Sequence, residues 1–299
     1  MSIFVTGGTG GIGRHIIRAL TRQGMNVTCL SRNNSPPALN GANSITASIF
    51  QSRVYGPALV DATAILHMAA LTHSTDPSKY HTVNVEGTRI LLNEAKERGF
   101  KGRFIFMSTR AQGASCGAYG ESKSLAEDLV RQSGQLWTIL RPAEIYGMGK
   151  GEALDKVMDM VRRSSFVLVP GSGEHTLAPV HIDDVVAATV AAVLENVARF
   201  KTYNLSGPNE LSYTEILDMI EAAFRVRRVR VHVPLALLSA AGSVARLLRL
   251  KASPVVCDQI PRLLCPKDAD IEEARADLRY SPRPFPSGLA ALVAPPAKA

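Results

Sequence analysis

Cysteine is scarce in this sequence, and its spacing excludes several classes of site. The chain contains four cysteines, Cys29, Cys116, Cys257 and Cys265, with no close pair of the kind that a zinc site or a dithiol motif uses. We therefore expect a reduced, intracellular protein without a metal site. The amino terminus lacks a basic segment followed by an apolar stretch, so a secretory signal is not predicted and a cytoplasmic location is expected.

Long apolar runs are equally scarce. Only Val233–Leu250 is about long enough to cross a bilayer, and Arg246 and Arg249 interrupt it. We expect a buried or lid-like helix that starts at Pro234, and we predict no transmembrane segment. A position of this stretch on a membrane surface stays open as an alternative.

An acidic excess is also missing, because 34 Lys and Arg residues outnumber 26 Asp and Glu residues and give a net charge of +8. This balance favours acidic ligands such as phosphorylated cofactors or substrates. Arg225, Arg227, Arg228 and Arg230 form the densest basic cluster. We interpret the cluster as a solvated face and predict no nucleic-acid binding.

In the first half of the chain, short apolar runs alternate with helical patterns. The apolar runs are Ile3–Val5, Val27–Leu30, Ala64–Leu66, Phe104–Met107 and Trp137–Leu140. The helical patterns between them include Gly11–Arg22, Lys79–Arg98 and Tyr119–Gln132. Strands that are apolar throughout and are separated by helices indicate a parallel sheet covered on both faces. The sequence therefore predicts an α/β protein with a doubly wound, Rossmann-type sheet.

After Pro142 the alternation loosens into helices near Glu152–Arg163, Asp183–Glu195 and Tyr213–Arg225. We predict that residues 1–149 form a dinucleotide-binding domain. Residues 150–299 are expected to form a smaller, mostly helical substrate lobe, with part of the chain crossing back to the sheet.

The stretch TGGTGGIG, which starts at Thr6, lies between the first predicted strand and the first predicted helix. Glycines at positions 7, 10 and 13 allow a pyrophosphate to approach the main chain, and the helix that follows points free N–H groups at the anion. In this context the spacing predicts a dinucleotide site. The second predicted strand ends at Ser31 and Arg32, where an acidic residue would bind the ribose of NAD, so we expect NADP(H) to be favoured over NAD(H).

Several ordered motifs resemble those of the extended short-chain dehydrogenase/reductase superfamily, within it the NAD-dependent epimerase/dehydratase family. Besides the glycine loop, they are ILHMAA (Ile65–Ala70), NVEGT (Asn84–Thr88), FIFMST (Phe104–Thr109), YGESK (Tyr119–Lys123), LRPAEIYG (Leu140–Gly147), VHIDDVV (Val180–Val186) and YNLSG (Tyr203–Gly207). Each motif alone is weak, and their joint order is specific.

This resemblance implies that Tyr119, Lys123 and Thr109 are catalytic. A phenol titrates near 10 in isolation, and the charge of Lys123, one helical turn later, would lower that value. Tyr119 would then carry the proton while hydride moves between cofactor and substrate carbon, and the Thr109 hydroxyl would bind the substrate oxygen. Asn84 would hold the sheet edge near the active site.

The resemblance also implies the binding residues. Those expected to hold the cofactor are Gly7, Thr9, Gly10, Gly11, Ile12, Gly13, Ser31, Arg32, Ala69, Ala70, Leu71, Tyr119, Lys123, Pro142 and Ile145. Arg110, Tyr119 and Glu144 are expected to contact the substrate. The family's arginine for a nucleotide diphosphate is replaced by Leu177, so Arg110, Arg141, Arg162 or Arg163 would have to supply that charge.

Three functions compete on these residues. We expect an NADP(H)-dependent reductase or dehydrogenase acting on a keto group, most readily that of a nucleotide sugar, because Ser31 and Arg32 are unlike an NAD-binding acid. The alternatives are an NAD-dependent nucleotide-sugar 4-epimerase and a non-catalytic nucleotide-binding member. Dehydration is disfavoured because Ser108-Thr109-Arg110 replaces the Thr-Asp-Glu of dehydratases. A homodimer is what the resemblance implies, and His67 and the Asp183-Asp184 pair are expected to serve packing and helix capping.

Overall fold

The computed structural model describes residues 1–32, 41–149, 153–195, 198–238 and 255–293, with side chains of 255–259 left out. Its centre is a seven-stranded sheet in the order β11-β6-β5-β4-β1-β2-β3, in which every pairing is parallel. The strands are β1 (Ser2–Thr6), β2 (Asn26–Ser31), β3 (Asn43–Thr46), β4 (Ala64–His67), β5 (Arg103–Met107), β6 (Leu136–Pro142) and β11 (Lys201–Leu205). The predicted doubly wound sheet is confirmed.

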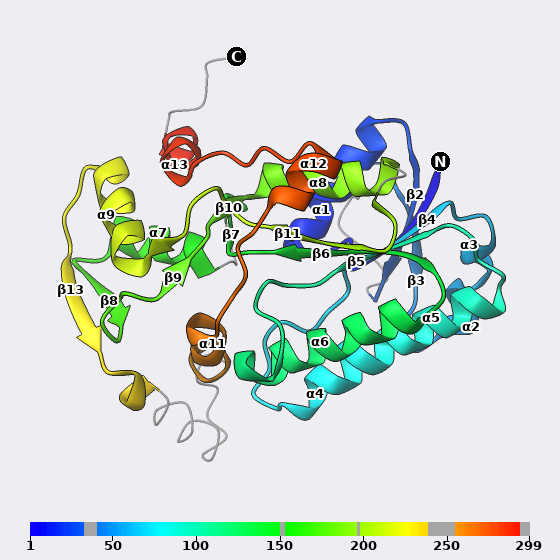
Figure 1. Cartoon of the computed structure of the whole chain (residues 1–299), viewed down its shortest axis with the longest axis horizontal. Helices are drawn as coiled ribbons and strands as arrows, with labels where there is room; N and C mark the ends of the chain where they lie inside the picture. The colour runs from blue at the N-terminus through cyan, green and yellow to red at the C-terminus, as the bar shows by residue number, and fades with distance from the viewer. Residues whose placement is uncertain (33–40, 150–152, 196–197, 239–254, 294–299) are drawn as a thin grey trace.

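Helices cover both faces of the sheet (Figure 1). One layer contains α1 (Gly11–Arg22), α8 (Ile182–Leu194) and α12 (Glu272–Leu278), whose apolar side chains share a core with β1, β2 and β5. The other contains α2 (Ser52–Tyr55), α3 (Pro57–Val60), α5 (Gly87–Glu97) and α6 (Gly117–Gln132). Because β4 and β5 lie between these layers, all their residues are buried. This double burial explains why their sequences do not alternate.

The predicted helix Lys79–Arg98 is not regular. It consists of α4 (Ser78–Tyr80), a π-helical segment (His81–Glu86) and α5. In the π-helical segment, Asn84 lies buried with its amide toward the loop after β4, donating to the Leu71 carbonyl and accepting from the Leu71 N–H. The same amide donates to Ser122 on α6. The π-helical segment therefore joins two neighbouring parts of the site.

A second core lies beyond the sheet. It is formed by side chains of the helices α7 (Ala153–Arg163), α9 (Tyr213–Phe224) and α13 (Phe285–Val293) and of the strands β7 (Ile145–Tyr146), β8 (Phe166–Pro170), β9 (Thr176–Leu177) and β12 (Leu211–Ser212). Two further strands adjoin these elements: β13 (Val229–Val233) pairs with β8, and β10 (Val180–His181) pairs with β7. The last strand of the main sheet, β11, pairs with β6, so the chain crosses back as expected. The boundary at residue 150 stays a prediction. Residues 239–254 of the expected Val233–Leu250 helix lie outside the described residues.

The start of α8 corrects one expectation. Asp183 and Asp184 do not cap this helix; His181 does, because its Nδ1 accepts from the Asp183 N–H. Asp184 instead binds the guanidinium of Arg283, with 2.8 Å between Oδ1 and Nη2. This pair connects α8 to the segment before α13.

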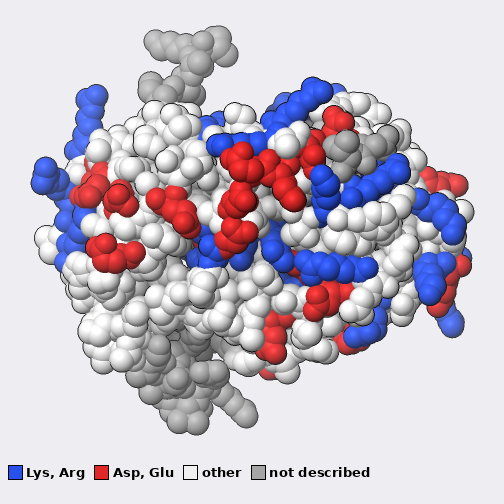
Figure 2. Space-filling view, in the orientation of Figure 1, with Lys and Arg blue, Asp and Glu red and all other residues white. Residues whose placement is uncertain are grey.

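Many of the basic residues lie on the solvent-exposed surface. On the face shown in Figure 2, Lys and Arg side chains are interspersed with Asp and Glu side chains. In the expected basic cluster, Arg230 binds Asp218 and Glu221, and Arg228 donates to the Val161 carbonyl. No helix among the described segments is long and apolar enough to cross a bilayer.

His67, at the end of β4, is a packed core residue as expected. Its ring lies between the hydroxyls of Thr6 and Thr88, at 2.6 and 2.9 Å, and burial lowers its pKa from 6.5 to about 3. Between these values the unfolded chain binds one more proton than the native chain. The free energy of unfolding should therefore fall as the pH drops from 6.5 toward 3.

We expect His67 to contribute a slope of about 1.4 kcal/mol per pH unit in that window. Urea unfolding across the window should show a slope smaller by this amount in His67→Asn, whatever the variant's absolute stability. An identical slope in the two proteins would show that His67 does not titrate as described.

Candidate active site

The carboxyl ends of the parallel strands meet at one edge of the sheet, and the predicted site residues lie there. The chain runs outward from β1 through β2 to β3 and then returns to place β4 on the other side of β1. Nucleotides bind at such a switch in strand order. The predicted residues lie where these strands end or directly after them. Thr9, Ile12 and the glycines follow β1, Ser31 and Arg32 lie at the end of β2, Ala69 to Leu71 follow β4, Thr109 and Arg110 follow β5, and Glu144 and Ile145 follow Pro142 at the end of β6.

Some glycines of the loop are required by the protein itself. Gly7 has φ +75°, and a Cβ there would lie 2.6 Å from the N atom of Ala69 in the loop after β4. A Cβ on Gly13 would lie 2.7 Å from the Cα of Gly8 and would also meet the Gly7 carbonyl. These residues therefore allow the loop after β1 to pack against its own helix and against β4.

Gly10 and Gly11 differ, because they are exposed at the amino end of α1. A Cβ would meet its first neighbour at 3.3 Å on Gly10 and at 3.5 Å on Gly11. Gly10 caps α1 without a side-chain hydrogen bond. The N–H groups of the first turn of α1 therefore point outward from a helix start that has no side-chain cap. A pyrophosphate binds at helix starts of this kind. The loop fits the expected dinucleotide.

Ser31, the last residue of β2, is buried, and Arg32, which follows it, is exposed. The cation therefore follows directly on the strand whose end normally binds the cofactor ribose.

Tyr119 lies in the first turn of α6, with 8% of its surface exposed and its ring 5.8 Å from that of Tyr80. One turn later, Lys123 is buried; its Nζ donates to the Met107 carbonyl at 2.8 Å and lies 4.0 Å from the Phe106 ring centre. Burial lowers the pKa of Lys123 from 10.5 to about 7, and the carboxylate of Glu127 opposes this only in part. Without a nucleotide, Lys123 thus loses its charge as the pH rises through neutrality.

The two hydroxyls at the end of β5 point to different partners. Ser108 is buried, and its Oγ donates to Glu127 on α6 at 2.5 Å. Thr109 is half-buried, and its Oγ1 accepts from the Ala111 N–H at 3.2 Å. Thr109 is therefore the hydroxyl of this pair that lies on the loop side of the strand end.

Arg110 and Glu144 form the centre of an ion-pair network with two buried cations, which we call the Glu144 network. Glu144 binds Arg110 at 2.9 Å and Lys267 at 3.1 Å, and Arg110 also contacts Glu210 at 3.3 Å. Burial acts to raise the pKa of Glu144, but Lys267 and Arg110 outweigh it and hold the pKa below its usual value. Both cations are nearly inaccessible, with 1% and 4% of their side chains exposed.

The other arginines considered for a diphosphate have different positions. Arg141 binds Glu127, with 2.6 Å between Nη2 and Oε2, on the α6 side of the sheet. Arg162 and Arg163 are exposed at the end of α7, where Arg163 lies 3.8 Å from Asp159. Of the four candidates, Arg110 is the one that contacts Glu144.

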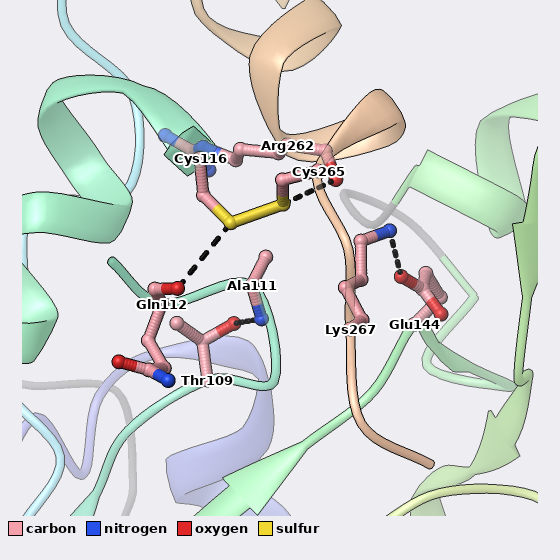
Figure 3. Close-up of a disulfide and its surroundings, with 8 residues drawn as sticks. All are labelled: Thr109, Ala111, Gln112, Cys116, Glu144, Arg262, Cys265 and Lys267. Carbon is pink, nitrogen blue, oxygen red and sulfur yellow. Dashed lines mark hydrogen bonds and ion pairs between the residues drawn. A yellow bond between two sulfur atoms is a disulfide. The ribbon is translucent and has the colours of Figure 1, made fainter. Parts of the chain in front are cut away.

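Sequence reasoning missed the last turn of α11 (Val255–Leu264) and the residues that follow it. Figure 3 shows a disulfide between Cys116, just before α6, and Cys265, with a Cα–Cα distance of 5.2 Å. Near it, the guanidinium carbon of Arg262 lies 3.7 Å from the ring centre of Tyr119. The expectation that all four cysteines are reduced is therefore wrong for this pair. The two residues are 149 positions apart, so no local spacing could reveal them.

The strand order, the glycine loop and the Tyr119–Lys123 helix together define a Rossmann-type protein of the nucleotide-binding class. The model of the NAD dependent epimerase/dehydratase family matches residues 3–206. The chain belongs to this family, which confirms the resemblance seen in the motifs.

Similar proteins differ in their activities. The chain is 26% identical to 2-alkyl-3-oxoalkanoate reductase of Stenotrophomonas maltophilia over 317 residues, covering 95% of each. It is 30% identical to photosystem II assembly factor Ycf39 of Synechocystis over 252 residues, 82% of this chain and 74% of that one. The structure of Bacillus cereus UDP-glucuronic acid 4-epimerase with UDP-glucuronic acid and NAD matches with a TM-score of 0.77 at 22% identity, over 98% of each chain. This last likeness shows the fold.

Substitutions in the glycine loop should separate packing from nucleotide binding. Gly13→Ala is expected to lower the free energy of unfolding by about 1–3 kcal/mol, because its methyl group meets backbone on two sides. Gly10→Ala should change stability less and weaken nucleotide binding more, since its methyl group enters the space before the helix start. Gly11→Ala, with more room and its N–H retained, is the matched control.

Urea unfolding and fluorescence titration with NADPH measure the two effects. Equal losses of binding in Gly10→Ala and Gly11→Ala would contradict the particular closeness of Gly10 to the nucleotide. An unperturbed stability of Gly13→Ala would contradict the packing role of Gly13.

Proposed function

We propose that this protein is an NAD(P)-dependent oxidoreductase that transfers hydride to or from a carbonyl or hydroxyl carbon, with Tyr119 as the acid/base. The observation that carries the proposal is the pair of buried side chains, Tyr119 and Lys123, on one face of α6 beside the end of β5. They stand at the same sheet edge as the glycine loop. This is the arrangement that a nicotinamide nucleotide lying across the edge would require.

Each proposed catalytic residue has one role. A bound nicotinamide nucleotide supplies the hydride donor or acceptor. The Tyr119 hydroxyl would give its proton to the substrate oxygen during reduction and take it back during oxidation. Thr109 would hold that oxygen by a hydrogen bond, and Lys123 would bind the nicotinamide ribose and favour the ionised form of Tyr119.

The first substrate candidate is a keto group of a nucleotide sugar. It is supported by family membership and by the likeness in fold to a UDP-sugar 4-epimerase that holds its substrate and NAD. If the substrate is a nucleotide sugar, Arg110 would bind its diphosphate. To do so, Arg110 would have to give up part of its ion pair with Glu144.

The Glu144 network favours a second candidate, an open-chain 3-oxo compound. Two buried cations already face the carboxylate of Glu144, and Arg110 also faces Glu210, so the network is balanced in formal charge. A doubly charged diphosphate gains little from cations that are already paired. The reductase from Stenotrophomonas maltophilia, which covers nearly the whole chain, is named for substrates of this open-chain class.

Two further functions, epimerisation and nucleotide binding without catalysis, would require different properties of the protein. An epimerase retains its nucleotide through oxidation and reduction and shows no net change in cofactor redox state. A non-catalytic member, as the likeness to an assembly factor suggests, has no use for a buried tyrosine and lysine on α6. We therefore rank the oxidoreductase first.

Tyr119→Phe should lower kcat/KM by about 10²–10⁴-fold, because it removes the proton-transferring hydroxyl. Turnover is measured by NADPH and NADH absorbance with 3-oxo acids and with 4-keto nucleotide sugars, and UDP-sugars are assayed for epimerisation. Tyr55→Phe is the matched control, since Tyr55 is equally buried but bonds to the Ile49 carbonyl away from the site.

Undiminished activity in Tyr119→Phe would end the acid/base assignment. Sugar inversion without net cofactor oxidation would replace the oxidoreductase by the epimerase. Nucleotide binding without turnover of any substrate in the panel would favour the non-catalytic member.

We further propose that NADP(H) is preferred, on the strength of Arg32 at the end of β2. A guanidinium pairs well with a 2′-phosphate, and such a charge-assisted contact is worth roughly 1.5–3 kcal/mol. Arg32→Ala should therefore weaken NADPH binding by about tenfold or more while leaving NADH binding unchanged. Arg89→Ala, which alters an exposed pair on α5, is the control. Equal losses for both nucleotides, or none, would reject the preference.

A further inference from the structure

Residues 262–267, which we call the strap, contact the proposed active site at three separate points. Arg262 lies over the ring of Tyr119. Figure 3 shows the other two contacts, the bond between Cys265 and Cys116 and the ion pair between Lys267 and Glu144. The strap begins in the last turn of α11, which contains Arg262, and continues beyond the helix to Lys267; α11 packs against α6 (Figure 1). A short piece of chain thus reaches both the acid/base tyrosine and the expected substrate contact.

The position of Arg262 is defined by several groups. Its guanidinium carbon is 3.7 Å from the centre of the Tyr119 ring and 5.9 Å from that of Tyr80. Its Nη2 donates to the Thr72 carbonyl at 2.6 Å and lies 3.4 Å from the Tyr80 hydroxyl. The cation therefore lies against the face of the ring that would carry negative charge as a phenolate.

Arg262 thus contacts the ring of Tyr119 from α11, and Tyr80 contributes a neutral ring from α4. A second cation, Lys123, lies one turn after Tyr119 on α6. The two cations differ in the pH range over which they keep their positive charge. Burial lowers the pKa of Lys123 to about 7, whereas a guanidinium stays charged at any physiological pH. Arg262 is consequently the cation that remains beside Tyr119 above neutrality.

The disulfide fixes the distance between these partners. Cys116 precedes Tyr119 by three residues, and Cys265 follows Arg262 by three residues. Each end of the bond is therefore about one helical turn from one member of the Arg262–Tyr119 pair. A covalent link this close limits how far α11 can move from α6.

We propose that Arg262 is a positioning residue for Tyr119, and that the Cys116–Cys265 disulfide holds it in place so that the proton step depends on the redox state of this bond. The inference rests on the proposed function, because it needs Tyr119 to be the acid/base. It assigns to the strap a role in catalysis that the glycine loop and α6 do not supply.

Opening the bond requires an external dithiol. One thiolate of the dithiol attacks a sulfur of the disulfide, the Cys116–Cys265 bond breaks, and a mixed disulfide forms. The second thiolate closes the ring of the oxidised dithiol and releases the second cysteine. Two electrons and two protons pass to the protein as two thiols, and Arg262 is then held by its noncovalent contacts alone.

The test is the pH profile of kcat/KM for alcohol oxidation, in which Tyr119 acts as phenolate. The part of this profile that is set by ionisation of Tyr119 is called the tyrosine limb. Arg262→Met should move this limb to higher pH by about one unit, because an adjacent positive charge favours ionisation of the phenol. Arg262→Lys should restore most of the wild-type position. Dithiothreitol treatment of the wild type and the Cys265→Ser substitution should each shift the limb in the same direction.

Cys265→Ser should not respond further to dithiothreitol, and Cys29→Ser, which alters the buried unbonded cysteine, should behave as wild type with and without the reductant. An unshifted limb in Arg262→Met, or faster turnover with the limb unchanged, would overturn the role of Arg262. If complete reduction of the disulfide in the wild type leaves the pH profile of kcat/KM unchanged, the proposed role of the disulfide is wrong. If Tyr119→Phe is inactive while these variants keep the wild-type limb, the inference fails and the proposed function stands; full activity in Tyr119→Phe would remove both.

Discussion

The close approach of the glycine loop to the loop after β4 is the contact on which the proposed site depends. Gly7 allows it, because any side chain there would meet the backbone of Ala69. The Ala69 N–H then donates to the Thr6 hydroxyl, and two residues on, Leu71 exchanges hydrogen bonds with the amide of Asn84. Through Ser122, that amide reaches the helix of Tyr119. The expected nucleotide loop and the proposed catalytic helix are thereby held in one frame of short-range contacts.

Elements defined by local pattern could be predicted closely from the sequence. The helix Gly11–Arg22 has the predicted bounds, since a glycine start and an amphipathic pattern lie within a few turns. The π-helical segment at Asn84 was not predictable, because it arises from bonds to Leu71 and Ser122 in other elements. Lys267, Arg262 and the disulfide were missed for the same reason: their partners lie more than a hundred residues away, and nothing in their immediate sequence indicates them.

Burial affects three cationic side chains of the proposed site, Arg110, Lys123 and Lys267, in two ways. Arg110 and Lys267 share the carboxylate of Glu144, so the low-dielectric surroundings strengthen their attraction. Lys123 donates instead to a neutral carbonyl, and its pKa falls to about 7 because desolvation outweighs the help of Glu127. The carboxylate of Glu144 thus stays ionised, because its pKa is held below the usual value, whereas Lys123 can change its charge near neutral pH. An approaching nucleotide, with its negative phosphates, would favour the charged lysine.

The features that this protein shares with its family lie in the first two thirds of the chain, and the strap lies after them. The family model ends at residue 206, and the residues matched by it include the glycine loop, Thr109, Tyr119 and Lys123. The strap lies beyond that limit, yet it contacts the ring of Tyr119 and the carboxylate of Glu144. The matched part therefore contains the residues to which the proposed function assigns hydride and proton transfer. Because the strap contacts the same tyrosine and the expected substrate contact, we expect differences in substrate and in control among related chains to depend partly on residues that the shared motifs do not include.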